Sequence, residues 1–567
     1  MLRMEHPKPQ FERSSWQNLN GEWEFEVDKS DSGEARGLFK PDAVYSQTIN
    51  VPFCPESKLS GIEHTDFMLA VWYRRKFTLT EEQTQGRIVL HFGAVDYKAT
   101  VEVNGKRVGE HEGGFVSFSF DITPFVQAGE NTLVLRAQDD TKPWLYPTGK
   151  QSKEYASYGC FYTRTTGIWQ TVWLEFTPKA YIQSSKYYPD PAAGTITFVT
   201  KVCGAGELKV EASYQGKPMG EAAAVVNGGV VTLTIPLKEK HLWEVGNGRL
   251  YDLKWTFNDD EVKSYFGLRS VALDGYKFLL NGKSVFQRLI LDQGFYPDGI
   301  YTAPSDQELE ADIDRSLALG FNGARLHEKI FEERFLYHCD RKGYIVWGEF
   351  PDWGADWMKG VQSGCREWIE EVERDFNHPA IVGWCPLNER WEREANEYCK
   401  TPYAITKALD PTRPCIDASG GIHVQTDIYD VHDYEQDPAV FAKSYAPEKV
   451  LDGTFLDWIK DKHTPNKSVY KLGQAFFVSE YGGIGWTEDQ SGWGYGNAPK
   501  TEEEFFTRLK GLTDVLLDNP YICALCYTQL TDVEQEQNGL YTYDRKPKFA
   551  CEKIYPIFSK KAAIEEE

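Results

Sequence analysis

Two runs of apolar residues in the second half of the chain each lead directly to a glutamate. The run 380–385 is followed by the tetrapeptide Pro-Leu-Asn-Glu, which ends at Glu389. The run 475–478 is followed by Ser-Glu-Tyr-Gly-Gly, in which the glutamate is Glu480. Strands that are buried on both faces of a parallel sheet have such nearly continuous apolar sequences. The two glutamates are therefore expected at the carboxyl ends of two buried parallel strands.

Around these runs, from residue 272 onward, predicted strands alternate with predicted helices. Helix starts carry capping boxes, such as the one in which Ser305 precedes Glu308. Eight strands with intervening helices are typical of a (β/α)8 TIM barrel, whose active site lies at the carboxyl ends of the strands. The predicted strands are 286–291, 320–326, 344–350, 380–387, 413–418, 427–433, 475–480 and 521–529. In this order Glu389 follows the fourth strand and Glu480 ends the seventh.

The chain before residue 272 has the pattern of two all-β domains. Short strand-like runs, such as Glu22–Val27, and an Asn-Gly hairpin turn at Asn104 predict a jelly-roll-like β-sandwich at the N-terminus. After Pro178 the strand pattern repeats in a smaller unit, of a size that suits an immunoglobulin-like sandwich. The prediction is a multidomain chain with a sugar-binding-type sandwich at 1–178, an immunoglobulin-like sandwich at 179–271 and a catalytic barrel at 272–567.

Composition argues against several other classes of protein. The chain of 567 residues has a formal net charge of -23, which disfavours a surface for nucleic acid or for an anionic membrane. It has no apolar run of about 18 residues, and its N-terminus lacks the apolar core of a signal peptide. The 11 cysteines are scattered, and we interpret Cys523 and Cys526 as buried thiols. These features predict a cytoplasmic protein.

Two glutamates at one barrel rim are suited to the hydrolysis of a glycosidic bond. The reaction needs an acid that protonates the leaving oxygen, for which we predict Glu389. It also needs a nucleophile that attacks the anomeric carbon, for which we predict Glu480. Retention of configuration requires the two carboxyl groups to lie about 5–5.5 Å apart, a distance that a sequence cannot give. An Asn-Glu dipeptide on its own is more often a solvated surface feature, so the assignment depends on the barrel and on the pairing.

Further residues near the predicted strand ends are candidates for binding the sugar. Asn388 can hydrogen-bond the 2-hydroxyl group, and Arg325 can donate to the nucleophile, with a structural ion pair as its alternative role. Tyr527 can form an aromatic platform for the sugar, and Trp486 belongs to a loop that shapes the pocket. The other candidates, each with a structural role as the alternative, are His327, His432, Tyr434, Asp292, Trp347 and Glu349.

At these residues the chain resembles glycoside hydrolase family 2, the β-galactosidase and β-glucuronidase family. Besides the two glutamate motifs, the resemblance is carried by Asn20–Trp23, Thr166–Leu174, Phe278–Lys283, Gly320–Arg325, Asp410–Pro414 and Asn538–Arg545, so it covers nearly the whole chain. It implies three domains, a homo-oligomer and a retaining double displacement. By position, the resemblance places the acid/base at Glu389, its neighbour at Asn388 and the nucleophile at Glu480.

One departure from the family pattern guides the choice of substrate. Family β-glucuronidases carry an Asn-x-Lys pair whose lysine meets the uronate carboxylate, whereas the segment 534–539 here reads Glu-Gln-Glu-Gln-Asn-Gly. Glutamates there would repel a carboxylate, so the first prediction is an exo-acting β-galactosidase. Lys329 could supply a different carboxylate contact, which keeps the uronide alternative open. Phe161 stands where the family often has an acidic residue, so we expect no metal and no other cofactor.

Alternatives to a β-galactosidase therefore remain. Within the family they are a β-glucuronidase or β-galacturonidase and an α-L-arabinosidase. From another class, the alternative is a carbohydrate-binding protein without turnover, although sugar binding alone does not need a matched acid and nucleophile. In each case the expected partner is a small-molecule or oligosaccharide glycoside, and neither a nucleic acid nor a membrane.

Overall fold

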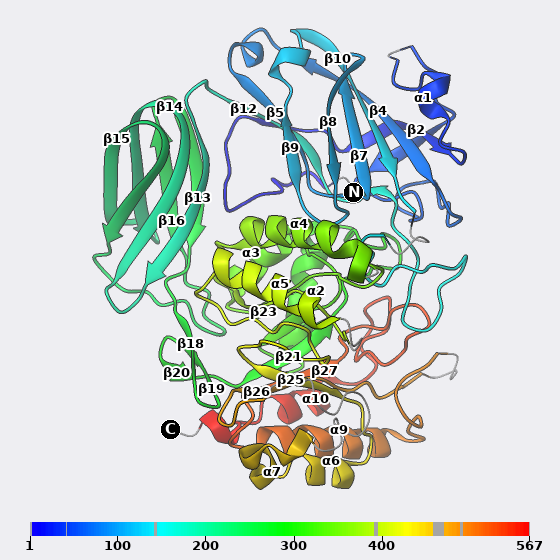
Figure 1. The fold of residues 1–567 in the computed structure, drawn as a ribbon, viewed down its shortest axis with the longest axis vertical. Coiled ribbons are helices and arrows are strands. Elements are labelled where there is room, and N and C mark those ends of the chain that lie inside the picture. The colour runs from blue at the N-terminus through cyan, green and yellow to red at the C-terminus, as the bar shows by residue number, and fades with distance from the viewer. Residues whose placement is uncertain are drawn as a thin grey trace.

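The computed structural model describes most of the chain, and its strands and helices form three parts (Figure 1). The described residues are 3–40, 42–140, 145–355, 357–390, 395–456, 470–487 and 492–565. Two of the parts consist mainly of β-strands, and the third, nearer the C-terminus, alternates strands with helices. Within the described ranges, no helix has the length and apolar character that crossing a membrane requires.

The N-terminal part is a sandwich of two antiparallel sheets. The first has the order β1 (Trp16–Asn18), β12 (Val172–Thr177), β5 (Arg87–Phe92), β9 (Phe118–Asp121). The second has the order β3 (Gln47–Val51), β2 (Gly21–Asp28), β4 (Ala70–Leu79), β10 (Gly129–Gln138), β7 (Lys98–Val103), β8 (Lys106–Glu112). The short elements α1 (Gly33–Arg36), β6 (Val95–Asp96) and β11 (Gly167–Ile168) complete this part. Alternate strand residues, among them Trp23, Leu90 and Leu135, point inward and form its core.

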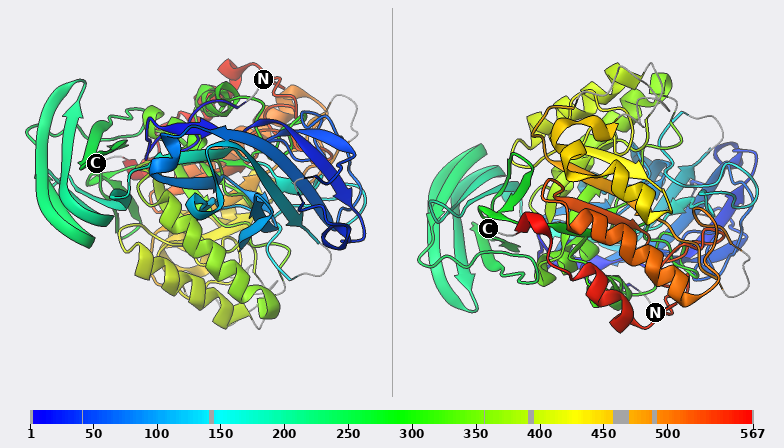
Figure 2. Two further views of the ribbon diagram at one scale, coloured as in Figure 1. Left: turned by 90° about the horizontal axis from the view of Figure 1, so that it is seen from above. Right: turned by 90° about the horizontal axis from the view of Figure 1, so that it is seen from below.

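The second part is one antiparallel sheet that curves around its own core (Figure 2). Its strands are β13 (Tyr181–Asp190), β14 (Thr195–Tyr214), β15 (Lys217–Pro236), β16 (Tyr251–Phe257) and β17 (Asp260–Phe266). The first half of β14 pairs with β13, its second half pairs with β16, and β15 pairs along its whole length. The register shifts between Val202 and Ala205, where Gly204 has a φ of 91°. Such a bulge bends a strand, which lets one strand serve both halves of the domain.

A small sheet of β18 (Val271–Asp274), β19 (Lys277–Leu280) and β20 (Lys283–Ser284) leads into the barrel. The barrel strands are β21 (Gln287–Asp292), β22 (Gly323–Leu326), β23 (Ile345–Glu349), β24 (Ile381–Cys385), β25 (Tyr429–Asp433), β26 (Phe476–Gly482) and β27 (Ala524–Thr528). Their pairing is parallel, in the order β24-β23-β22-β21-β27-β26-β25. The helices are α2 (Asp306–Ala318), α3 (Glu333–Lys342), α4 (Trp357–Asp375), α5 (Ala395–Leu409), α6 (Pro438–Ser444), α7 (Pro447–Asp452), α9 (Glu502–Leu517) and α10 (Cys551–Phe558).

One predicted barrel strand is wrong. The segment 413–418 forms no regular strand, although it lies beside β24 through the isolated bridge between Trp384 and Cys415. Trp384 N donates to Pro414 O at 3.0 Å, and Ile416 N donates to Trp384 O at 2.9 Å. Pro414 has no N–H group, so it cannot donate to a second neighbour in a ladder. The segment therefore fills the place between β24 and β25 with irregular backbone.

The first sandwich rests on the barrel, with α4 directly below β8 and β9 in the view of Figure 1. Glu367 of α4 accepts a hydrogen bond from Phe115 N at 2.7 Å, which joins the two parts in a buried contact. Near the N-terminus, Arg3 pairs with Glu332 of the barrel at 2.8 Å. These buried contacts fix the loops of the first sandwich relative to the barrel strands.

Candidate active site

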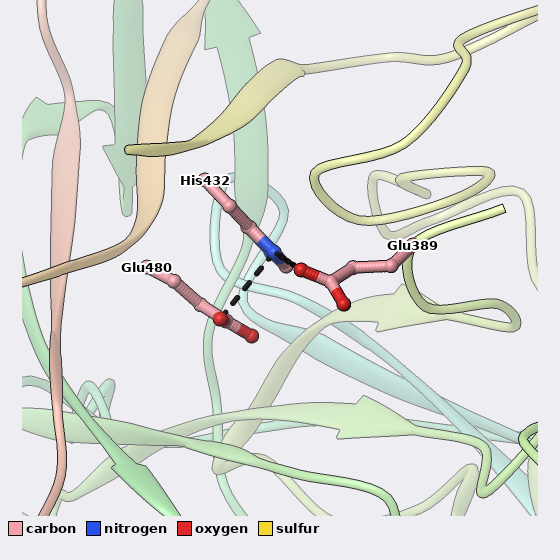
Figure 3. A group of neighbouring side chains, drawn as sticks. All are labelled: Glu389, His432 and Glu480. Atoms are coloured by element: carbon pink, nitrogen blue, oxygen red, sulfur yellow. Dashed lines mark hydrogen bonds and ion pairs between the residues drawn. The ribbon is translucent and has the colours of Figure 1, made fainter. Parts of the chain in front are cut away.

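The structure brings Glu389 and Glu480 together, with His432 between them (Figure 3). One carboxylate oxygen from each glutamate and a ring nitrogen of His432 all lie within 4.8 Å of one another. His432 Nδ1 is 2.8 Å from Glu389 Oε1 and 3.4 Å from Glu480 Oε2. His432 belongs to β25, Glu480 belongs to β26, and Glu389 lies in the turn after β24. All three side chains therefore lie at the same end of the barrel. This separation suits the roughly 5 Å spacing of carboxyl groups in a retaining glycosidase.

Glu480 is a buried carboxylate that is held in its charged form. Its Oε1 accepts from Arg325 Nη1 at 2.6 Å, and its Oε2 accepts from the Tyr434 hydroxyl at 2.5 Å. Burial alone would raise the pKa of Glu480, but the charges of His432 and Arg325 outweigh burial and hold that pKa well below its usual range. The group is therefore ionised at neutral pH, as a nucleophile must be.

Glu389 is the more accessible of the two, with a side chain that is 30% exposed. Its backbone has a φ of 48°, the left-handed region that non-glycine residues rarely adopt. The Glu389 N–H donates to Ser419 O at 2.8 Å, so the irregular segment beside β24 fixes this turn. Strained backbone of this kind concentrates at functional sites, where the surrounding structure holds it in place.

Hydrogen bonds hold His432 in place on both ring nitrogens. Ser419 Oγ lies 3.1 Å from His432 Nε2, and the same hydroxyl donates to Asp430 Oδ2 at 2.7 Å. The other nitrogen, Nδ1, faces Glu389 and donates to its carboxylate. Burial lowers the pKa of His432, but the charges of Glu480 and Glu389 outweigh burial and raise that pKa above its ordinary value. The two glutamates therefore favour the protonated form of the imidazole that lies between them.

Arg325 connects the nucleophile to the rest of the site. Besides Glu480, its guanidinium donates to Glu349 Oε2 at 2.5 Å and to Asn388 Oδ1 at 2.7 Å. His327 Nδ1 lies 2.7 Å from the other oxygen of Glu349. Burial raises the pKa of Glu349 to about 7 despite the charge of Arg325. Burial also holds the pKa of His327 well below its ordinary value, so this imidazole is neutral.

Asn388 has one amide nitrogen available for a ligand. Its Oδ1 is occupied by Arg325, and its backbone N–H donates to Asp352 Oδ1 at 2.7 Å. Its buried Nδ2 has no hydrogen-bond partner within the described part of the chain. A buried donor without a partner is costly, so this N–H₂ group is suited to a hydroxyl of a bound sugar.

Four of the predicted site residues lie away from the glutamates. Trp347 is 1% exposed and donates to Gln287 inside the barrel, and the Tyr527 ring packs 5.8 Å from the Phe558 ring of α10. Successive strand side chains alternate between the barrel interior and the helix layer, and this alternation turns Tyr527 outward. The other two are Trp486, whose ring packs against Phe505 and Phe549, and Asp292, whose Oδ1 accepts from Gly294 N at 2.9 Å.

Lys329 is also committed to a structural role, contrary to the expectation that it could contact a substrate carboxylate. Its Nζ donates to Gly294 O at 2.6 Å and to Tyr301 O at 2.8 Å. The ammonium lies within 6 Å of four aromatic rings, and burial lowers its pKa to about 7. A lysine in such an enclosure stabilises the barrel and not a ligand.

Two residues at the site, Trp353 and Lys150, were missed by the sequence analysis, whereas Tyr495 belongs to the loop that was expected to shape the pocket. Trp353 Nε1 donates to Asn388 O at 3.2 Å, and the Tyr495 ring stacks on Tyr434 with 3.4 Å between centroids. Trp353 follows β23 at the carboxyl end of the barrel, so its position could have been noticed. Lys150 belongs to the first domain, and no sequence pattern connects it with the barrel rim.

Within the described ranges, the cluster of Glu389, His432 and Glu480 could offer three ligand atoms to a metal ion. The protons of His432 and the guanidinium of Arg325 compensate the same carboxylate charges, so a cation would have to compete with them. The expectation that no metal is needed stays a prediction.

Two family models match the chain. The glycosyl hydrolase 2 galactose-binding domain-like model matches residues 34–167, and the glycosyl hydrolases family 2 TIM barrel domain model matches residues 271–483. The β-glucuronidase of Rattus norvegicus is 30% identical over 450 residues, which cover 70% of this chain and 67% of that protein. The chain belongs to glycoside hydrolase family 2. It is therefore an O-glycosyl hydrolase, and the resemblance found in the sequence is confirmed.

Other proteins that are similar to this family 2 hydrolase are also β-glucuronidases. The β-glucuronidase of Sus scrofa is 29% identical over 468 residues, 72% of this chain and 69% of that protein. A β-glucuronidase from an uncultured Clostridium species has a TM-score of 0.78 at 21% identity, covering 98% of this chain and 99% of that one. A β-glucuronidase from Ruminococcus gnavus, in complex with uronic deoxynojirimycin, has a TM-score of 0.80 at 20% identity, with 96% and 98% covered. These matches confirm the predicted fold class, and the relatives favour the uronide alternative over the galactoside that was placed first.

Proposed function

We propose that this family 2 hydrolase is an exo-acting, retaining β-uronidase whose substrates are terminal β-D-glucuronides. The observation that carries the mechanism is the grouping of Glu389 and Glu480, which have carboxylate oxygens within 4.8 Å of each other. Glu480 is also held as a carboxylate, as a nucleophile requires. The substrate class is supported by the relatives, since the curated proteins and solved structures named above are β-glucuronidases.

In the first step of the proposed reaction, Glu480 attacks the anomeric carbon and Glu389 protonates the leaving oxygen. The C1–O bond breaks, a Glu480–sugar ester forms, and the alcohol leaves with the proton. Arg325 and Tyr434 orient the attacking carboxylate through their two hydrogen bonds. The Nδ1 proton of His432 lies on a 2.8 Å hydrogen bond to Glu389, so it can supply the acid with its proton.

In the second step, Glu389 acts as a base. It takes a proton from a water molecule that attacks the anomeric carbon, and the Glu480 ester bond breaks with net retention of configuration. Glu389 can then pass this proton to Nδ1 of His432, which restores the hydrogen bond between the two residues. Asn388 Nδ2 is available for the 2-hydroxyl group, a contact that strengthens in the transition state.

The glutamates of the segment 534–539 repel a uronic acid substrate less strongly than the sequence alone suggests. Glu536 is 2% exposed and accepts hydrogen bonds from the Tyr162 hydroxyl and from Asn538 Nδ2. Glu534 accepts from Thr163 N at 3.1 Å. Protein donors therefore fix both carboxylates, and the Lys150 ammonium, which lies within electrostatic reach of Glu536, offsets part of the negative charge.

A panel of nitrophenyl glycosides tests this proposal. We expect the highest kcat/KM on the β-D-glucuronide, compared with the β-D-galacturonide, β-D-galactoside, β-D-glucoside and α-L-arabinoside. The β-galactoside is the second candidate, because the segment 534–539 contains no lysine. A best rate on a neutral sugar would reject the uronide proposal and leave the retaining mechanism intact.

A further inference from the structure

A segment of the first domain, residues 148–163, crosses onto the barrel rim and contributes a lysine to the site. One end is fixed by Thr148 N, which donates to Trp353 O at 2.7 Å, and by Gly149 N, which donates to the same oxygen at 3.0 Å. Gly149 has a φ of 56°, and a Cβ atom there would lie 2.5 Å from Glu328 O. Only glycine allows the segment to approach the barrel this closely.

The other end of the segment is fixed to the loop after β27. The Tyr162 hydroxyl donates to Glu536 Oε2, and Gln535 Nε2 donates to Gly159 O at 2.8 Å. Within the segment, Tyr162 N donates to Lys150 O at 2.8 Å, which ties its two ends together. The segment is thus held between the loops that follow β23 and β27, and Lys150 lies where it meets the barrel.

Lys150 is a buried ammonium that packs on an aromatic ring and has no hydrogen-bonding partner among the residues that the structure describes. The residue is 7% exposed, and its Nζ lies 5.1 Å from the centre of the Trp353 ring, whose indole N–H bonds to the backbone of Asn388. In the described parts of the chain, its Nζ forms neither an ion pair nor a hydrogen bond. Lys329, in contrast, already donates to two backbone carbonyl groups. Of these two buried lysines, Lys150 is therefore the one that is suited to bind an anion.

The surroundings keep this ammonium charged. Burial alone would lower the pKa of Lys150, but the charge of Cys160 when ionised and the carboxylates of Glu536, Glu480 and Glu389 raise it. Lys150 in turn contributes to the low pKa of Glu480, so the two groups lie within electrostatic reach of each other. A buried cation within electrostatic reach of the nucleophile, whose N–H groups have no acceptor in the described parts of the chain, has the chemistry of an anchor for a carboxylate.

We infer that Lys150 binds the carboxylate of the uronic acid substrate, so that the first domain supplies the specificity of the barrel for a charged sugar. This inference rests on the proposed function. It assigns the charge recognition to a residue far in sequence from the segment 534–539, which has no lysine. A purely structural alternative is that Lys150 only balances the negative charge of the site.

The test compares two substrates that differ only at C6, nitrophenyl β-D-glucuronide and nitrophenyl β-D-glucoside. For Lys150→Met we expect the ratio of kcat/KM for glucuronide over glucoside to fall roughly 10- to 100-fold, as for the loss of one hydrogen bond to a charged group. Lys150→Arg should restore part of the ratio, and Lys150→Glu should lower it further. The matched control is Lys76→Met, an exposed lysine of the same domain, which should leave the ratio unchanged.

Binding supplies a second readout that does not depend on turnover. In the background of Glu480→Gln, calorimetry should show D-glucuronate binding weaken upon Lys150→Met by a similar factor. Equal losses on both substrates, or no loss of glucuronate affinity, would overturn the anchor and leave the glucuronidase proposal standing. If the unmodified chain prefers the glucoside, the proposed function itself fails, and the anchor fails with it.

Discussion

Arg325 donates from Nη1 to Oε1 of Glu480 at 2.6 Å, with both side chains buried. A buried, charge-assisted hydrogen bond of this kind both orients a carboxylate and keeps it ionised. The same guanidinium holds Asn388 and Glu349, so one residue of β22 aligns side chains that follow or end three other strands. The consequences of this arrangement can be measured.

Replacing Arg325 by methionine should lower kcat/KM by about 100-fold or more, as for the loss of one preorganised donor. The acid limb of the pH profile should also move to higher pH, because the charge that lowers the pKa of Glu480 is removed. Arg325→Lys, which keeps a charge but not the planar fork, is the control and should shift the limb less. An unshifted limb in both variants would contradict the electrostatic role.

Replacing either glutamate by glutamine should separate their roles. Glu480→Gln should abolish turnover on every substrate, because no nucleophile remains. Glu389→Gln should retain partial activity on aryl glycosides with good leaving groups, since these need little acid assistance. The measurement is kcat/KM across aryl glycosides of graded leaving-group pKa. Near-wild-type rates for both variants on alkyl glycosides would refute the assignment.

His432→Asn should shift the acid limb of kcat/KM to higher pH. The cationic imidazole is the largest electrostatic contribution that lowers the pKa of Glu480, so its removal raises that pKa, and the nucleophile protonates earlier as the pH falls. We also expect a larger loss of rate for poor leaving groups than for good ones, because His432 hydrogen-bonds the acid. If kcat/KM falls by the same factor at every pH, so that the acid limb does not move, His432 has a structural role alone.

Tyr434→Phe should lower kcat by about 10- to 100-fold, the cost of one hydrogen bond to a charged group. The variant removes the hydroxyl that donates to Glu480 Oε2 but keeps the ring that stacks on Tyr495. Tyr495→Leu is the complementary change, which removes the stacking and keeps the hydroxyl. If Tyr434→Phe retains full activity, the 2.5 Å contact has no part in catalysis.

Gly149→Ala should lower both the activity and the melting temperature. The added Cβ would lie 2.5 Å from Glu328 O, so the segment 148–163 would have to move away from the barrel. Gly159→Ala is the matched control in the same segment, because Gly159 has a φ of 52° but no atom within 4 Å of the added Cβ. The control should lose about 1–2 kcal/mol of stability from the left-handed backbone while the activity is kept. Equal activities in the two variants would show that the close contact between the segment 148–163 and the barrel is not needed for activity.

Several features of the fold could be predicted from the sequence because they depend on local patterns. The continuous apolar runs before Glu389 and Glu480 indicated buried strands, and both strands are present as β24 and β26. The capping box at Ser305 marked the start of α2, and its hydroxyl accepts from Glu308 N. The prediction of a strand at 413–418 was wrong. The apolar residues of this segment favoured a strand, but Pro414 has no N–H group to complete the ladder.

Side-chain direction could not be predicted equally well. A shift of one residue turns a strand side chain from the barrel interior to the helix layer. Tyr527 and Trp347 lie on barrel strands, yet one packs against α10 and the other fills the barrel interior. Proximity in sequence to a strand end was therefore insufficient to identify a pocket residue.

The sequence by itself determined the strands that carry the two glutamates, since hydrophobic periodicity and chain order are local properties. Only the tertiary structure decided the charge states and the partners. The raised pKa of His432, the ionised Glu480 and the charged Lys150 each depend on burial near groups that are distant in the chain. Electrostatic energies depend on distances in space and on the exclusion of water, and neither quantity follows directly from the amino-acid sequence.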